Sequence, residues 1–239
     1  LIGGLLDSLL SQDYPKESFE IIVVDNNSND TTCDVVRSYP VALLHENEVQ
    51  SSYAARNLGV NAAKGDVIAF TDSDCCVSSS WLSEGVRVIL EDSVDLIGGK
   101  VDFLFSEKKT AAEMYDSLTN LMNDIYVKER SFSVTANLIV RAKLFEKIGL
   151  FDSELQSGGD SEWTSRAVHH GYQLSYVPTC VVSHPARSFK ELLKKRKRVA
   201  KGSYDKQRKQ GVRALKILTT SFRSALPGRL RHFRRLIQE

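Results

Sequence analysis

The sequence Asp66-Val67-Ile68-Ala69-Phe70-Thr71-Asp72-Ser73-Asp74 joins a short apolar run to two acidic residues. Residues 67–70 are mostly β-branched or aromatic, which predicts a buried strand. Side chains alternate along a strand, so we expect Asp72 and Asp74 to share one face. Two neighbouring carboxylates repel unless a cation or a donor lies between them, and Mg²⁺ or Mn²⁺ prefers such oxygen ligands. The stretch therefore predicts a ligand or metal site at the end of a strand, with a turn or cap role as the alternative.

The rest of the chain alternates strand-like and helix-like segments around this stretch. We expect helices at residues 5–10, 31–38, 53–63, 81–90, 111–126, 142–149 and 161–170, and strands at residues 20–25, 41–44, 67–70, 94–101, 174–177 and 180–182. This order favours an α/β fold with a mostly parallel mixed sheet and helices on both faces. From Val94 onward, antiparallel strands are also compatible with the pattern.

Charge is distributed unevenly along the chain. The net charge is +2, but residues 187–239 hold 18 Lys and Arg against three acidic residues, a net of +15, which leaves −13 for residues 1–186. The sequence from Ser188 is helical in pattern and rich in cations. We therefore expect two parts, a domain at residues 1–186 and a basic helical extension at residues 187–239.

The cysteines and the apolar segments indicate the compartment. Cys33, Cys75, Cys76 and Cys180 form no Cys-x-x-Cys pair and have no zinc-like spacing to histidine, so we interpret them mainly as packing thiols in a reducing cytosol. No apolar run is long enough to span a bilayer, and the start does not have the pattern of a signal peptide. These features predict a cytoplasmic protein.

Five ordered motifs connect the chain to a known family. They are residues 20–30 (EIIVVDNNSND), 55–59 (ARNLG), 65–74 (GDVIAFTDSD), 159–163 (GDSEW) and His184. Together they resemble glycosyltransferase family 2, over about residues 1–188. The resemblance implies the GT-A fold, a Rossmann-like α/β sheet, and inverting transfer of a sugar from a nucleotide-diphosphate sugar, most commonly a UDP-sugar. It also implies Mg²⁺ or Mn²⁺ as cofactor and a cell-surface or lipid-linked glycan as acceptor.

The resemblance also implies roles for individual residues. Asp160 would be the catalytic base, Asp74 the main metal ligand and His184 a later metal or diphosphate contact. Asp25 would accept a hydrogen bond from the base of the nucleotide, and Arg56 would lie near the nucleotide. Asp72 would contact the ribose or the metal. Asn137, Glu162 and Trp163 would lie by the donor sugar or the acceptor.

Each of these residues also has a purely structural interpretation. Asp160 can cap a helix that starts at Ser161, and Asp25 can start an Asx-turn. His184 before Pro185 can be a turn residue, Arg56 an exposed helix residue, and Trp163 a core residue. If Asp160 is the base, we expect the helix N-terminus to favour its ionised form.

The sequence departs from the family pattern at two places. The apolar first strand and its turn, which wall the nucleotide pocket in the family, are not found before the first helix, so we expect the chain to begin just after them. Gly159 stands where the family often has Glu. The alternative is therefore a catalytically inactive relative that binds a nucleotide or acts as a scaffold. A nucleotidyltransferase is a second alternative, but that class requires a Gly-rich phosphate-binding loop after its first strand, and the sequence shows none.

The basic extension raises a separate question about partners. Residues 194–198 (KKRKR) and 229–237 (RLRHFRRLI) mix cations with spaced apolar residues. Such a helix is typical of binding to an anionic membrane surface, which would place the protein at the inner face of the membrane. A solvated helical face is the alternative, and nucleic acid is the less favoured anion.

Overall fold

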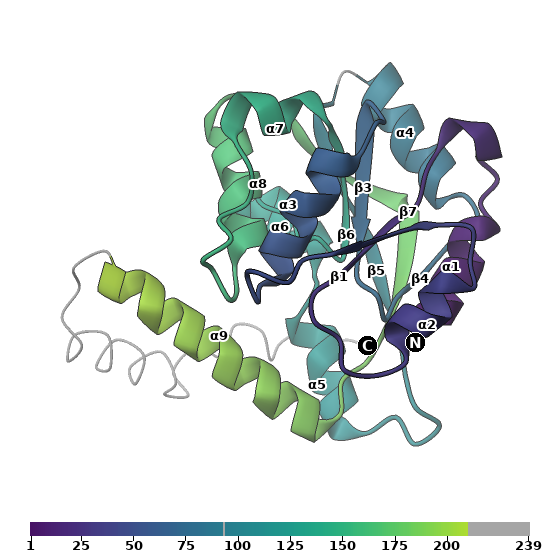
Figure 1. The fold of residues 1–239 in the computed structure, drawn as a ribbon. Helices are drawn as coiled ribbons and strands as arrows, with labels where there is room; N and C mark the ends of the chain where they lie inside the picture. The colour runs from purple at the N-terminus through teal and green to yellow at the C-terminus, as the bar shows by residue number, and fades with distance from the viewer. Residues whose placement is uncertain (93, 210–239) are drawn as a thin grey trace.

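The computed structural model describes residues 1–92 and 94–209, and shows an α/β fold (Figure 1). Its helices are α1 (Ile2–Leu10), the 3₁₀ turn η1 (Lys16–Ser18), α2 (Thr32–Arg37), α3 (Ser52–Ala62), α4 (Trp81–Glu91), α5 (Ala111–Thr119), α6 (Asn123–Arg130), α7 (Lys143–Ile148), α8 (Gly159–His169) and α9 (Phe189–Lys209). Its strands are β1 (Ile22–Asp25), β2 (Ala42–His45), β3 (Val67–Thr71), β4 (Cys76–Val77), β5 (Leu96–Leu104), β6 (Asn137–Arg141) and β7 (Leu174–Pro185).

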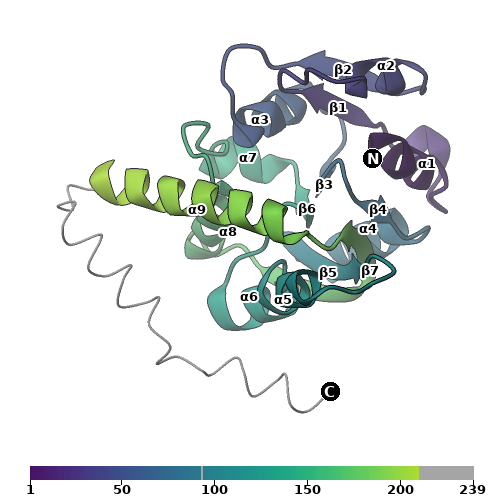
Figure 2. The same ribbon diagram turned by 90° about the horizontal axis from the view of Figure 1, so that it is seen from below.

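The strands form two sheets. β1 and β2 pair in parallel, with Ile22 opposite Ala42, and stand apart from a five-stranded sheet of order β3-β6-β5-β7-β4 (Figure 2). The expected α/β class with a mixed sheet flanked by helices is confirmed. Within the described five-stranded sheet, however, only β5 and β7 pair in parallel, so the expectation of a mostly parallel sheet is wrong there.

Two segments differ from the sequence prediction because local signals were weak. The helix expected at residues 111–126 is two helices, because Leu121 adopts a positive φ of 54° without a glycine to announce the break. α5 begins with a capping box in which Thr110 and Glu113 bond each other's backbone. The strands expected at residues 174–177 and 180–182 are one strand, β7, with a register shift against β5 between Gly99 and Lys100. β4 and β6 were not expected.

Two apolar clusters hold the helices against the strands. In one, α1 and α4 pack through Leu6, Trp81 and Ile89 against buried residues of β5 and β6. In the other, α7 and α8 pack through aromatic rings; Phe145 stacks on Trp163 with centroids 4.4 Å apart. Burial of rings this large removes much apolar area from water. Phe70 belongs to this cluster, so the end of β3 is held on a rigid support.

The space between the two sheets is a cavity of about 1460 Å³, called here the central cavity. Its walls are the backbone and side chains of β1 and β3, the start of α3, the turn after β3, the start of α8, and the near side of α9. No backbone hydrogen bond joins β1 to β3 among the described residues. The cavity therefore lies where the sheet is interrupted, at the end of β3.

The basic extension begins as α9, which confirms the expected helix after Ser188. α9 leaves β7, passes α5, and reaches the loop before α8, where Gly202 lies against Ser157 (Figures 1 and 2). Leu192, in the first turn of α9, is buried. The basic segment at residues 229–237 lies outside the described residues. Within the described part of the chain, the helices are all too short or too polar to cross a membrane.

Candidate functional site

The two acidic residues after β3 lie in a turn that opens into the central cavity. β3 ends at Thr71, and the amide of Cys75 donates to the carbonyl of Asp72 at 3.0 Å, so strand alternation does not extend to Asp74. Both carboxylates nevertheless line the cavity. The turn sends them to different partners, Asp72 to Arg56 and Asp74 to His184.

Asp72 forms an ion pair with Arg56, which α3 supplies. The Arg56 guanidinium Nη2 donates to Asp72 Oδ1 at 2.9 Å, and its carbon lies 5.5 Å from the centre of the Tyr53 ring. Both side chains are only partly exposed, at 19% and 31%. Arg56 thus neutralises one of the two carboxylates and offers its remaining N–H groups to an anion in the cavity.

Asp74 lies next to His184, the histidine of β7. His184 Nε2 is 3.7 Å from Asp74 Oδ2, and the ring is buried with 1% of its side chain exposed. Its Nδ1 lies 2.6 Å from the carbonyl oxygen of Pro185, which can only accept, so we assign the proton to Nδ1. The Nε2 lone pair then accepts from Arg187 Nη2 at 2.9 Å, and a metal beside Asp74 would take the place of that donor.

These atoms fit a divalent cation. Asp74, Cys75 and His184 each place one ligand atom within 4.8 Å of the others. A carboxylate oxygen and a neutral imidazole nitrogen suit Mn²⁺, and the carboxylate suits Mg²⁺. Burial, together with Asp72 and Asp74, raises the pKa of the Cys75 thiol to about 12, so this sulfur stays protonated and contributes little.

Asp160 lies in the first turn of α8 and faces the same cavity. Its Oδ1 accepts from the amide of Ser161 at 2.9 Å and from the Tyr53 hydroxyl at 3.5 Å. Burial raises the pKa of Asp160 above its usual value, although the Ser161 amide and Arg56 act in the opposite direction. The Ser161 amide at the helix N-terminus favours the ionised form, as expected, but desolvation outweighs it and makes Asp160 a stronger base.

Gly159 permits this arrangement. A Cβ at residue 159 would lie 2.9 Å from the Tyr53 ring, closer than side-chain atoms approach. Tyr53 thus fills the space beside the carboxylate that a side chain at residue 159 would need. Burial and the Asp160 charge raise the pKa of Tyr53 to about 12, so its hydroxyl remains a donor to Asp160.

Asp25 ends β1 on the far side of the sheet interruption. Its carboxylate accepts from the Ser28 amide at 3.3 Å and lies 3.6 Å from His45 Nδ1. Burial raises the pKa of Asp25, but hydrogen bonds from Ser28, Cys33 and His45 together lower it, so the group is ionised. Asp25 does not line the central cavity, whereas its neighbour Asn26 does.

Besides Asp25 and His184, three further sequence-predicted residues do not line the cavity. Asn137 is fully buried: its Oδ1 accepts from Trp81 Nε1 at 2.9 Å and its Nδ2 donates to the carbonyls of Lys100 and Cys180. Trp163 is also fully buried and donates to the carbonyl of Gly149 at 2.7 Å. Glu162 forms an ion pair with Arg166 at 3.0 Å. All three occupy structural positions, so we leave them out of the proposed site.

The cavity residues that sequence reasoning missed include Tyr53, Arg187, Lys195 and Arg198. Tyr53 lies three residues before Arg56 and therefore on the same face of α3. This spacing could have predicted Tyr53 from the sequence. Arg187 and Lys195 were grouped with the basic extension as part of one undivided charge run. Their inward position depends on the docking of α9, which no local pattern announces.

Comparison with known proteins relates this chain to glycosyltransferases. The model of the family described as Glycosyl transferase family 2 matches residues 1–149. Glycosyltransferase AglE of Haloferax volcanii is 44% identical over 206 residues, which cover 84% of this chain and 68% of AglE.

Two solved structures share the fold. The mannosyltransferase PcManGT from Pyrobaculum calidifontis, in complex with GDP-Man and Mn²⁺, superposes with a TM-score of 0.65 at 22% identity, covering 85% of this chain and 58% of that one. Staphylococcus aureus TarS 1–349 in complex with UDP-GlcNAc gives a TM-score of 0.60 at 26% identity, covering 78% and 55%. This chain thus spans little more than half of either structure.

Proposed function

The chain belongs to glycosyl transferase family 2, and from that premise we propose that it is a metal-dependent, inverting transferase that moves a sugar from a nucleotide-diphosphate sugar to an acceptor hydroxyl. One observation supports this most: Arg56, Asp72, Asp74 and Asp160, from three separate segments, line one cavity. PcManGT and TarS were solved with GDP-Man and UDP-GlcNAc, which fits a nucleotide-sugar donor. Of the two, we favour a UDP-sugar.

The proposed chemistry divides between the two ends of this cavity. Asp160 would take the proton from the acceptor hydroxyl as that oxygen attacks the sugar, helped by its raised pKa and oriented by the Tyr53 hydroxyl. Asp74 and His184 would hold Mg²⁺ or Mn²⁺, which when bound neutralises charge that develops on the leaving diphosphate. Attack from the side opposite the leaving group accounts for inversion.

The remaining polar residues would position the donor. Arg56 holds Asp72 at 2.9 Å and, through this pair, fixes one carboxylate towards the ribose or the metal. Asp25, ionised at the end of β1, would accept a hydrogen bond from the base. A donor bound in this way would span the interruption between β1 and β3.

Thermal unfolding tests the donor site. We would measure the midpoint with UDP, GDP, CDP and dTDP, each with and without Mn²⁺. A ligand at about 100 times its dissociation constant stabilises by roughly 2.7 kcal/mol, a shift of about 5–10 °C for a chain of this size. We expect a shift with one nucleotide only when Mn²⁺ is present. Asp74→Ala should abolish it, and Asp92→Ala, at an exposed residue at the end of α4, should not.

No metal-dependent shift with any of the four nucleotides would contradict the proposal. A shift that persists in Asp74→Ala would contradict the metal assignment.

We propose in addition that the side of α9 that faces away from the cavity binds an anionic membrane surface, where a lipid-linked or cell-surface glycan would be the acceptor. Phe189 and Leu193, one turn apart, are 72% and 61% exposed, and exposed Lys194 and Lys197 lie beside them. Apolar residues flanked by lysines are typical of helices at a membrane surface. No binding to anionic vesicles at low salt would refute this, as would unchanged binding by Phe189→Ser/Leu193→Ser.

A further inference from the structure

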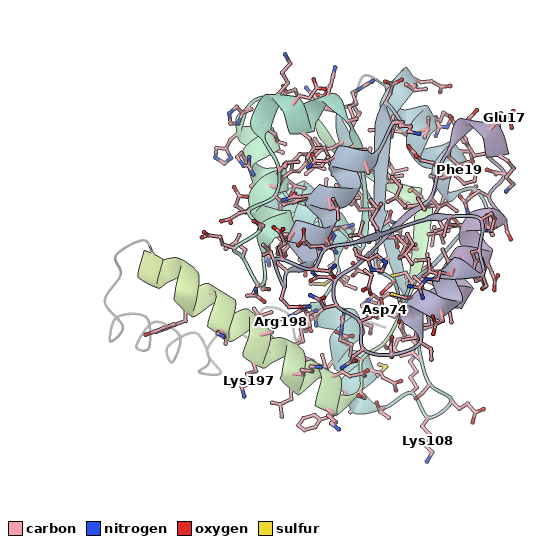
Figure 3. The ribbon with its side chains drawn as sticks, in the orientation of Figure 1. Glu17, Phe19, Asp74, Lys108, Lys197 and Arg198 are labelled. Atoms are coloured by element: carbon pink, nitrogen blue, oxygen red, sulfur yellow. The ribbon has the colours of Figure 1, made fainter. Side chains whose placement is uncertain are left out.

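α9 presents two different faces. Its inner face holds the cavity-lining Lys195, Arg198 and Val199 and the buried Leu192 and Gly202, and its outer face holds the exposed Lys190, Leu193, Lys194, Lys197 and Lys201. Leu192, in the first turn of α9, and Gly202, beside Ser157, are both buried, so the residues between them are held over the central cavity. In Figure 3, Arg198 extends from α9 on the side towards Asp74, and Lys197 on the opposite side.

Three cations reach the cavity from this segment. Arg187, Lys195 and Arg198 all line it, as Asp72 and Asp74 do. Lys195 and Arg198 are three residues apart on one helix and therefore project from the same side. Arg187, just before the helix, lies at the metal end because it donates to His184. The three form a row that runs from Asp74 outward along α9.

The protein partners of this row leave donors free. Asp116 of α5 accepts from the Arg187 amide at 2.9 Å and from its guanidinium at 3.3 Å, which fixes the first cation. Lys195 Nζ donates to the neutral Asn120 Oδ1 at 2.9 Å. Burial, with the Arg187 charge next, lowers the pKa of Lys195 to about 8, so its ammonium is held where an added negative charge would favour it.

We propose that Arg187, Lys195 and Arg198 form a phosphate-binding wall on the side of the cavity provided by α9, facing Asp72 and Asp74. The wall takes a phosphate or diphosphate group by charge-assisted hydrogen bonds. This inference rests on the proposed function, because it assigns part of the same cavity. The group comes either from the diphosphate of the donor or from a phosphate on the acceptor, which share this chemistry.

Inorganic pyrophosphate, without metal, tests the wall directly. Calorimetric titration at low ionic strength compares the wild-type chain with two matched double variants of α9. Lys195→Gln/Arg198→Gln removes two inner-face cations, and Lys194→Gln/Lys197→Gln removes two outer-face cations. Both lose the same net charge from the same helix, so long-range attraction changes equally. Circular dichroism establishes that both variants keep the wild-type fold.

We expect the inner-face variant to bind pyrophosphate at least about tenfold more weakly, and the outer-face variant within about twofold of wild type. Equal losses in the two variants would overturn the proposal, because the effect would then be general charge. So would wild-type affinity in the inner-face variant, or no binding by the wild-type chain.

Nucleotides then identify the source of the phosphate. With Mn²⁺, weaker binding of a nucleoside diphosphate but not of the monophosphate by the inner-face variant assigns the wall to the donor. Unchanged binding of both, with weaker pyrophosphate binding, assigns it to the acceptor. If all variants bind the nucleotide in a metal-dependent way and the two faces do not differ in pyrophosphate binding either, only this inference is overturned. Absence of metal-dependent nucleotide binding from every variant, wild type included, overturns the donor site itself.

Discussion

Asp116→Asn should destabilise the protein more than any loss of a surface charge, because Asp116 is a buried carboxylate that holds Arg187. The side chain is fully buried, and Arg187 is 19% exposed. Besides the two Arg187 donors, Asp116 Oδ1 accepts from Asn120 Nδ2 at 2.8 Å. An asparagine removes the charge and turns one acceptor into a donor that faces other donors. Breaking a buried ion pair costs about 3–5 kcal/mol; because Arg187 keeps some contact with water, we expect about 3 kcal/mol.

Differential scanning calorimetry measures this loss as a fall in the unfolding midpoint. For a chain of this size 1 kcal/mol corresponds to about 2–4 °C, so we expect a fall of about 6–12 °C. Asp102→Asn is the matched control: its ion pair with Lys100 is shorter, at 2.9 Å, but both side chains are nearly half exposed. Exposed pairs contribute about 0–1 kcal/mol, so this variant should lose less than about 4 °C.

The double variant Asp116→Asn/Arg187→Gln separates charge from packing. Removing both partners leaves no uncompensated charge, so the double variant should lose less than the sum of the two single losses. The reasoning is refuted if Asp116→Asn loses no more than Asp102→Asn, or if the two single losses at residues 116 and 187 simply add.

Four further outcomes follow from the site and its support. Asp160→Asn should slow release of the nucleotide from its sugar donor by about 10²–10⁴-fold in a turnover assay while leaving metal-dependent nucleotide binding within about twofold; equal losses in both would make the residue structural. The base must be ionised, and burial raises the pKa of Asp160, so kcat/KM should fall as the pH drops through a value above the usual aspartate range. Arg56 lowers this pKa, so Arg56→Gln should move the fall to higher pH. A fall that stays in place or moves to lower pH would exclude an effect of Arg56 on Asp160. Gly85→Ala would bring the added carbon into overlap with the Ile139 side chain of β6 and should cost about 1–3 kcal/mol in urea unfolding, whereas Gly4→Ala in α1, where the added carbon lies 3.7 Å from the Cys76 sulfur, should cost less; the reverse order would contradict the packing described. With its pKa raised to about 12, Cys75 should react with a thiol reagent at pH 7 only after unfolding; labelling of the native protein at this residue would contradict its burial.

The sequence predicted those parts of the fold that depend on local pattern. The strand at residues 67–70 and the helix over residues 81–90 both appear within two residues of their predicted ends, because apolar periodicity and caps are local properties. β6 was missed although residues 138–140 are apolar, because a short apolar run that leads into a helix does not by itself indicate a strand. Its antiparallel pairing with β3 is a long-range property.

In the candidate site, too, the residues that follow a local pattern could be predicted, and those that depend on long-range packing could not. The acidic pair and Asp160 could be found because they follow recognisable segments, and all three line one cavity. The structural role of Asn137 could not, because its three partners come from α4, β5 and β7. The pKa of Asp160 likewise depends on how deeply α3 and α8 bury it, a property that residue spacing does not contain.

The interrupted sheet also has a consequence for native-state fluctuations. β1 and β2 form a ladder of their own, joined to the larger sheet by side-chain packing and not by shared backbone hydrogen bonds among the described residues. Small units of this kind open and close more readily than a continuous sheet, so their amides exchange with deuterium first. A molecule in the cavity that touched both Asn26 and Asp74 would tie the two units together and slow that exchange. Exchange in the β1–β2 unit would then report whether the cavity is occupied.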